Sequence, residues 1–166
     1  MVQLINEIIE LRGTNSFEFT NKTSNHIRHL KEQTLEVPNT SGLYLVFRKQ
    51  ISGESESTFS HLIYLIEDEK FELIYFGKAG GLTKEGKAIK QGLRGRINNV
   101  ITDSIRGLKD IKRANYWNII MKEFNIDQLR ILYSEVSNPQ DFENIIYKFL
   151  DNHNLKYPIL NKKRGR

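Results

Sequence analysis

Two short motifs of this chain each place a tyrosine near a glycine at the mouth of a predicted strand. Gly42-Leu43-Tyr44 opens one apolar run, and Tyr75-Phe76-Gly77-Lys78 closes another. A tyrosine can transfer a proton and a lysine can stabilise an anion, so the motifs offer acid–base and electrostatic chemistry. Because a tyrosine is a poor base at its ordinary pKa of about 10, we expect neighbouring cations to lower the pKa of Tyr44 or Tyr75. The sequence leaves open which tyrosine is the base, and whether both are core or framework residues.

Three more side chains extend this set toward phosphate chemistry. Arg96 lies on a probable helix, and its planar guanidinium can donate two hydrogen bonds to a phosphate. Glu143 lies early on a helix that begins at Asn138-Pro139. Asn161 follows that helix near the end of the chain. Plainer interpretations remain: a solvated arginine, a glutamate that complements the helix dipole, and a turn asparagine.

The composition limits the chemistry and the compartment. A chain of 166 residues fits one domain with a real core. It contains no cysteine, which excludes disulfides, thiolate zinc sites and a cysteine nucleophile. No apolar run approaches the roughly 18 residues of a membrane span, and the N-terminus has no signal-peptide pattern. We therefore expect a cytoplasmic protein without membrane contacts.

Charge is segregated along the chain, beyond the formal net charge of +5. The segment 78–122 has 11 Lys or Arg against 3 Asp or Glu, a net of +8, and residues 162–166 add +4. Residues 50–77 carry a net charge of −5. Such segregation is typical of proteins that bind polyanions, although a solvated lysine-rich surface would show the same composition.

The periodicity of the apolar residues predicts a mixture of strands and helices. Strands are expected at 43–49, 61–66, 71–77 and 129–136, and helices at 3–11, 22–35, 92–101, 110–124 and 139–150. The predicted buried stripe of the last helix is Phe142, Ile145, Ile146, Phe149 and Leu150. Whether 61–66 is a central strand or an added hairpin arm stays open. The expected fold class is α/β of the α+β type, a small, mostly antiparallel three-stranded sheet flanked by helices, with an N-terminal helical extension over 1–40 and one main domain over 41–166.

Taken in order, these features resemble the GIY-YIG nuclease family. The two tyrosine motifs, the arginine of Leu93-Arg94-Gly95-Arg96-Ile97, the helix glutamate and the Pro-x-x-Asn ending occur in the family's order over about 41–161. The resemblance implies a GIY-YIG-like fold and metal-dependent hydrolysis of DNA, with one Mg²⁺ or Mn²⁺ per active site bound by Glu143. It also implies catalytic roles for Tyr44, Tyr75, Lys78, Arg96, Glu143 and Asn161. Asn161 would orient Glu143 or a water.

The chain departs from the family pattern at several points. Many members carry a histidine or tyrosine one helical turn after the arginine, where this chain has Val100. Tyr44 and Tyr75 lie further apart in sequence than is usual, and the loop between Lys78 and Arg96 is long. The insertions look like added substrate-contacting loops, whereas Val100 argues against a mechanism that needs a titratable group there.

The compact size, with no appended recognition domain, resembles the stand-alone type II restriction endonucleases of the family. That resemblance implies a site-specific enzyme on double-stranded DNA, acting as a homodimer or by transient pairing on the DNA. Backbone contacts are expected from basic residues: Lys84, Lys87, Lys90, Arg94, Lys112, Arg113, Lys162, Lys163 and Arg164. The alternatives are a non-catalytic nucleic-acid-binding module on the same scaffold, or a nuclease acting in repair or on RNA.

Overall fold

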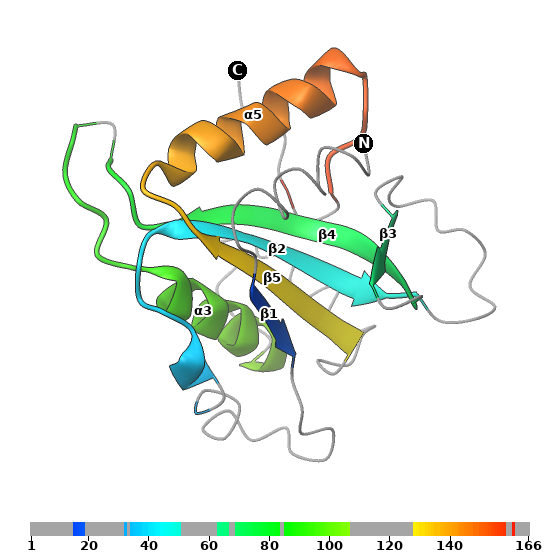
Figure 1. The fold of residues 1–166 in the computed structure, drawn as a ribbon, viewed down its shortest axis with the longest axis horizontal. Helices are drawn as coiled ribbons and strands as arrows, with labels where there is room; N and C mark the ends of the chain where they lie inside the picture. The colour runs from blue at the N-terminus through cyan, green and yellow to red at the C-terminus, as the bar shows by residue number, and fades with distance from the viewer. Residues whose placement is uncertain are drawn as a thin grey trace.

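The computed structural model of this chain is labelled by element in Figure 1. The elements are β1 (Asn15–Glu18), the 3₁₀ helix η1 (Thr34–Glu36), β2 (Gly42–Lys49), β3 (Ile63–Ile66), β4 (Glu69–Ala79), α3 (Leu93–Arg106), β5 (Leu129–Glu135) and α5 (Pro139–Asn152). The residues described are 15–18, 32, 34–50, 63–66, 69–83, 85–106, 128–158 and 161, without the side chains of 15–18, 63–66 and 100–106. The helices predicted at 3–11 and 110–124, and residues 22–31 of the helix predicted at 22–35, lie outside them. Among the described residues, no helix has the length and apolar composition needed to cross a membrane.

One antiparallel sheet forms the centre of the fold, with strand order β1-β5-β2-β4-β3. Its three long strands, β5, β2 and β4, form the small antiparallel sheet predicted from the sequence, and their bounds match the predicted runs closely. Two edge strands of four residues, β1 and β3, extend the sheet to five, so the prediction of three strands was incomplete. A strand as short as β1 shows no clear apolar alternation, and the sequence pattern therefore does not reveal it.

The segment predicted as an N-terminal helical extension contributes a strand to the sheet. Its residues Asn15–Glu18 pair with β5 at the sheet edge. Residues Thr34–Glu36, where the second predicted helix ends, form η1. At the opposite edge, β3 pairs with residues 69–72 at the start of β4. That pairing answers the question left open for 61–66, since this run is a hairpin arm and not a central strand.

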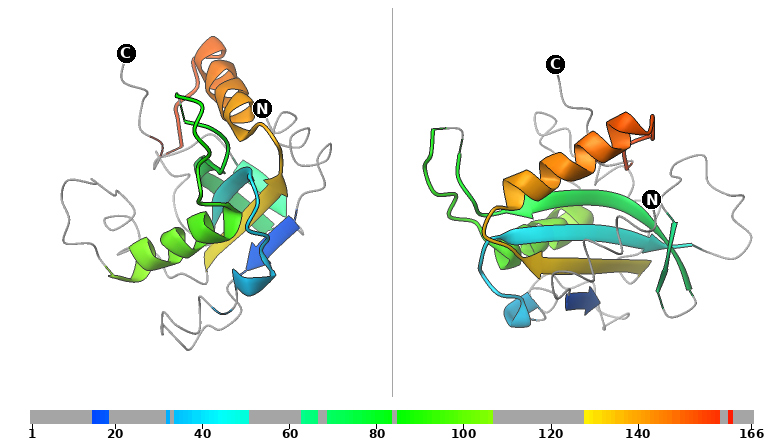
Figure 2. Two further views of the ribbon diagram at one scale, coloured as in Figure 1. Left: turned by 90° about the vertical axis from the view of Figure 1, so that its left-hand side faces the viewer. Right: turned by 45° about the horizontal axis from the view of Figure 1, so that its top comes forward.

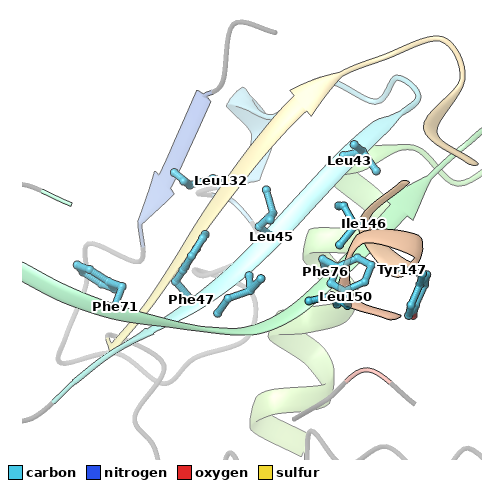
Figure 3. Packing of buried hydrophobic residues seen from close by; sticks show 10 residues of the cluster. Leu43, Leu45, Phe47, Phe71, Phe76, Leu132, Ile146, Tyr147 and Leu150 are labelled. Atoms are coloured by element: carbon cyan, nitrogen blue, oxygen red, sulfur yellow. The ribbon is translucent and has the colours of Figure 1, made fainter. Parts of the chain in front are cut away.

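Helices cover both faces of the sheet, with α5 on one face and α3 on the other (Figure 2). β2 is buried over all but its last residue, as a continuous apolar run predicts for a strand covered on both sides. The α5 face holds the cluster shown in Figure 3, in which Leu43, Leu45 and Phe76 of the sheet pack near Ile146 and Leu150 of α5. Successive side chains of a strand point to opposite faces of the sheet. Since Leu43 and Leu45 of β2 face α5, Gly42 and Tyr44 face α3.

The buried face of α5 differs in part from the predicted stripe. Ile146 and Leu150 are buried as expected, but Ile145 is 46% exposed and Tyr147 is buried. Tyr147 can be buried because its hydroxyl accepts a hydrogen bond from Nδ2 of Asn161, 3.2 Å away.

The start of α5 also differs in detail from its prediction. Pro139 is in the first turn as expected, but the side chain of Asn138 makes no capping hydrogen bond. Instead the backbone carbonyl of Asn138 accepts a hydrogen bond from the N–H of Asp141, at 3.1 Å. The helix start is thus closed by the backbone.

A buried ion pair joins two central strands and gives a stability prediction. Arg48 of β2 and Glu72 of β4 are cross-strand partners, 4% and 1% exposed, with Nη2 3.0 Å from Oε2. Replacing Glu72 by leucine removes the carboxylate partner of a buried guanidinium. We expect the free energy of unfolding, measured by urea denaturation, to fall by about 3–5 kcal/mol. The double variant Arg48→Leu/Glu72→Leu should recover most of the loss, and a double variant as unstable as the single one would contradict this account.

Candidate functional site

Tyr44 and Tyr75 lie side by side on the face of the sheet that α3 covers. Tyr44 is opposite Gly77 in the ladder of β2 and β4, and Tyr75 is opposite Val46. The centroids of the two rings are 5.7 Å apart, and the hydroxyl of Tyr44 donates a hydrogen bond to that of Tyr75. The two predicted tyrosines, which come from different strands, therefore form one pair.

Gly77 provides the space in which the two hydroxyls meet. A Cβ atom at this position would lie 2.9 Å from the hydroxyl oxygen of each tyrosine and 2.7 Å from Cε1 of Tyr75. Separations this short are essentially never found for a real Cβ atom. Any side chain at position 77 would therefore displace the tyrosine pair, which gives the glycine of the second motif a steric reason.

Gly42, in the first motif, provides the space for α3. A Cβ atom there would lie 2.3 Å from the carbonyl oxygen of Ser134 and 2.6 Å from Cδ1 of Leu93, at the start of α3. Because Gly42 and Tyr44 share a face of β2, the close approach of α3 brings its first turn, which ends at Arg96, toward Tyr44. The charge of Arg96 accordingly lowers the pKa of Tyr44, although burial outweighs it.

The segment that precedes β2 fixes the position of α3. The backbone N–H groups of Leu93 and Arg94 donate to the carbonyls of Thr40 and Pro38, at 2.9 and 3.1 Å, which satisfies donors that a helix start leaves open. The guanidinium of Arg94 donates to two more carbonyls of the same segment, at 2.8 and 2.9 Å. Arg94 is thus engaged with the protein's own backbone, and the nucleic-acid contact predicted for it stays a prediction.

Arg96 is half-buried and has an unusual feature. Its Nε atom is buried and has no hydrogen-bond partner among the described residues. An unsatisfied buried donor costs about 1–3 kcal/mol, and such groups are uncommon in native proteins. An anionic oxygen of a ligand can supply the missing acceptor. The charge of Arg96 acts on both tyrosines, so an anion held there would lie near the tyrosine pair.

Burial controls the protonation of both tyrosines. Loss of hydration raises the pKa of Tyr44 well above its ordinary value, and it also raises the pKa of Tyr75. For Tyr44, the neighbouring Tyr75 raises the pKa further, and the opposing effect of Arg96 is smaller. Arg96 lowers the pKa of both tyrosines, as predicted, but burial outweighs it, so the net shift is upward and both hydroxyls are protonated at neutral pH.

Glu143 lies on the second turn of α5 and is half-buried. Its negative charge raises the pKa of both Tyr44 and Tyr75, as a smaller contribution than burial. The carboxylate is therefore within electrostatic range of the tyrosine pair, although α5 covers the other face of the sheet. Nε2 of Gln140 is 3.5 Å from Oε2 of Glu143, at the long limit of a hydrogen bond. Glu143 and Arg96, on different helices, thus shift the pKa values of the same two tyrosines in opposite directions.

Glu135, the last residue of β5, is exposed and engaged elsewhere. Its Oε2 accepts a hydrogen bond from the Thr40 hydroxyl at 2.6 Å. Burial, followed by the charge of Glu135, raises the pKa of Tyr133. Within the described ranges, no three acidic or histidine side chains come together as a metal cluster. A single carboxylate can still hold Mg²⁺, because this ion usually completes its shell with waters and substrate oxygens.

Lys78 follows the tyrosine motif but lies on the other face of the sheet. It is paired with Leu43, whose side chain belongs to the cluster under α5, and residues directly opposite each other share a face. Tyr75 and Gly77 face α3, so the alternation of the strand separates half-buried Lys78 from the tyrosine rings. It places Lys78 on the side of α5, the helix that carries Glu143.

Asn161 is held by the edge of β4. Its Oδ1 accepts from the N–H of Phe76 at 2.9 Å, and its Nδ2 donates to the carbonyl of Phe76 at 2.8 Å. The side-chain amide thus pairs with one residue of β4 as a neighbouring strand would. Because Phe76 lies between Tyr75 and Gly77, Asn161 fixes the backbone beneath the tyrosine pair. This is a structural role, and the role of orienting Glu143 or a water stays a prediction.

The remaining predicted contacts are only partly within the described chain. Lys87 and Lys90 are exposed in the connection between β4 and α3. Outside the described residues lie Lys84, Lys112, Arg113, Lys162, Lys163 and Arg164. The side chain of Val100 is not described either.

No protein-family profile, curated protein or solved structure matches this chain. The candidate site therefore rests on its own geometry. That geometry combines a buried tyrosine pair, an arginine with an unsatisfied buried donor and a carboxylate on a second helix.

The hydrogen bonds of Asn161 give a second stability prediction. Asn161→Asp keeps the size and the acceptor but removes the donor to Phe76, and it places a charge at a position that is 9% exposed. We expect the free energy of unfolding to fall by about 1–3 kcal/mol in urea denaturation. The control is Asn152→Asp at the exposed end of α5. Equal stability of the two variants would contradict the role given to the Asn161 amide.

The buried tyrosines predict how stability depends on pH. Their pKa values in the folded protein lie above those of the unfolded chain, which are near 10. Their contribution to stability is therefore complete below pH 10 or so and is lost as the pH rises through the folded values. We expect urea-unfolding stability to decrease above about pH 10, with a shallower decrease in Tyr44→Phe. If absorbance showed all seven tyrosines ionising together in the folded protein, this prediction would fail.

Proposed function

We propose that this chain is a metal-dependent endonuclease of the GIY-YIG type that hydrolyses phosphodiester bonds of double-stranded DNA, as a restriction-type enzyme acting at specific sites. The observation that carries the proposal is the grouping of Arg96, Glu143 and the tyrosine pair. Arg96 has a buried donor without an acceptor among the described residues and is close enough for its charge to lower the pKa of both tyrosines, and a phosphate oxygen matches that donor. The order of the sequence motifs supports the same reaction class.

Arg96 binds the substrate phosphate in this proposal. Its Nε donates to a phosphoryl oxygen and so gains the acceptor that the described protein does not provide. The positive charge then opposes the negative charge that develops on that oxygen in the transition state. A fixed, partly buried guanidinium is effective here because it needs no reorganisation during the reaction.

Tyr75 is the proposed proton acceptor, and Tyr44 is its support. Tyr75 is partly exposed, whereas Tyr44 is 5% exposed and donates its hydroxyl hydrogen to Tyr75. The attacking water gives one proton to the phenolate oxygen of Tyr75 as its own oxygen bonds to phosphorus and the bond from phosphorus to the leaving sugar oxygen breaks. Tyr75 must first lose its proton, which burial and Glu143 oppose and Arg96 favours. We therefore expect the reaction to become faster as the pH is raised.

Glu143 fits a divalent-cation ligand, since it is a half-buried carboxylate near the tyrosine pair. One Mg²⁺ or Mn²⁺ per site would be held by Glu143, and when bound it would neutralise phosphate charge and stabilise the leaving oxygen. Lys78, on the α5 side, provides a further cation for the phosphate backbone. Cutting both strands requires two such sites, and the proposal therefore includes a homodimer or a transient pair on the DNA.

Cleavage of plasmid DNA tests this proposal. We expect the wild-type protein to produce discrete fragments with Mg²⁺ or Mn²⁺ and none with a chelator. Glu143→Gln and Arg96→Ala should each lower the cleavage rate by about 10²–10³-fold. Asp141→Asn is the matched control, because Asp141 is an exposed acid on the first turn of the same helix. Binding without cleavage by the wild-type protein would reject the nuclease and favour the non-catalytic binding module.

A further inference from the structure

The connection between β4 and α3 contains a hairpin, described over 81–83 and 85–89, which we call the 81–89 ribbon. Backbone hydrogen bonds of 2.9 and 2.8 Å join its two arms, and Leu82 pairs with Ala88 as an antiparallel bridge. Near its tip, Gly86 has a φ of 77°, which glycine adopts without strain. The ribbon projects beyond the end of the sheet, at the left of Figure 1. It is therefore a preformed arm and not an irregular loop.

The ribbon presents an apolar pair to solvent. Leu82 is 61% exposed, and Ala88 is exposed as well. As bridge partners, the two side chains lie on the same face of the ribbon. A single exposed leucine is ordinary, but an apolar cross-strand pair on a projecting arm is a surface that a partner can bury. Lys87 and Lys90, both exposed, lie beside this pair in the chain.

The base of the ribbon adjoins the candidate site. The ribbon follows β4, which carries Tyr75 and ends at Ala79, and it precedes α3, which carries Arg96 on its first turn. A Cβ atom at Gly81 would be 3.3 Å from the ring of Pro139, the first residue of the helix that carries Glu143. Both helices begin at the end of the sheet from which the ribbon projects (Figure 1). A long polymer bound at the tyrosine pair would therefore pass the ribbon.

We infer that the 81–89 ribbon enters the major groove of duplex DNA beside the cleaved bond, with Leu82 and Ala88 toward the base edges. This inference rests on the proposed function for the identity of the substrate. The major groove admits a two-stranded ribbon, and apolar side chains contact the methyl group of thymine there. Lys87 and Lys90 contact the flanking phosphates, which gives the arm the complementary charge. The ribbon thus selects cut sites that have thymine near the cleaved bond.

The test measures binding separately from cleavage. Fluorescence anisotropy follows binding of a mixed-sequence DNA duplex, with a chelator present, and of the same duplex with deoxyuridine in place of every thymidine. The variant is Leu82→Asn, and the matched control is Leu35→Asn, because Leu35 on η1 is 63% exposed. We expect loss of a contacted methyl group to weaken wild-type binding by about fourfold. Leu82→Asn should bind the thymidine duplex more weakly than the control and should no longer distinguish the two duplexes.

Each result decides the inference. Equal binding by Leu82→Asn and Leu35→Asn, or equal binding of the two duplexes by the wild-type protein, would overturn the ribbon's role. The absence of any duplex binding would overturn it as well. Plasmid cleavage run in parallel separates this inference from the proposed function. If cleavage is normal and the two variants bind equally, only the DNA-binding role of the ribbon is rejected. If Leu82→Asn selectively weakens binding but the wild-type protein does not cleave DNA, the role of the ribbon stands and the nuclease activity is rejected.

Discussion

Steric clearance over two glycines is the constraint on which the candidate site depends. At Gly42 the start of α3 approaches β2 so closely that one added carbon would overlap Leu93, and at Gly77 the same addition would overlap both tyrosine hydroxyls. The two positions lie on the same face of the sheet. Together they let a helix and two aromatic rings share the surface of two adjacent strands, so that Arg96 comes near the tyrosine pair.

Two long-range sets of hydrogen bonds keep that arrangement in place. Residues 38–40 accept from the first N–H groups of α3, and Arg94 adds its guanidinium to the same segment. From the other end of the chain, Asn161 pairs with Phe76 of β4. Both sets use polar groups that would be costly to bury unpaired. The backbone under the site is therefore fixed by segments far from it in sequence.

The candidate site contains buried polar groups that the described protein does not fully satisfy. Burial keeps both tyrosines neutral, and a buried arginine nitrogen lacks an acceptor within the described chain. Proteins generally satisfy such groups, and exceptions concentrate where a ligand completes them. An anion at Arg96 would supply the missing acceptor. A cation at Glu143 would offset the negative charge that helps to raise the tyrosine pKa values. At the Arg48–Glu72 pair, a buried guanidinium donates to a buried carboxylate of the protein itself.

The sequence by itself determined the long strands, the two helices and the set of candidate residues, because apolar periodicity and glycine positions are local properties. It did not determine β1, the buried position of Tyr147, or the roles of Arg94 and Asn161, because each depends on a contact with a distant segment. The tyrosine pKa values went against expectation for a related reason. Nearby cations can be guessed from a sequence, but the loss of hydration that outweighs them is decided only when the chain is packed.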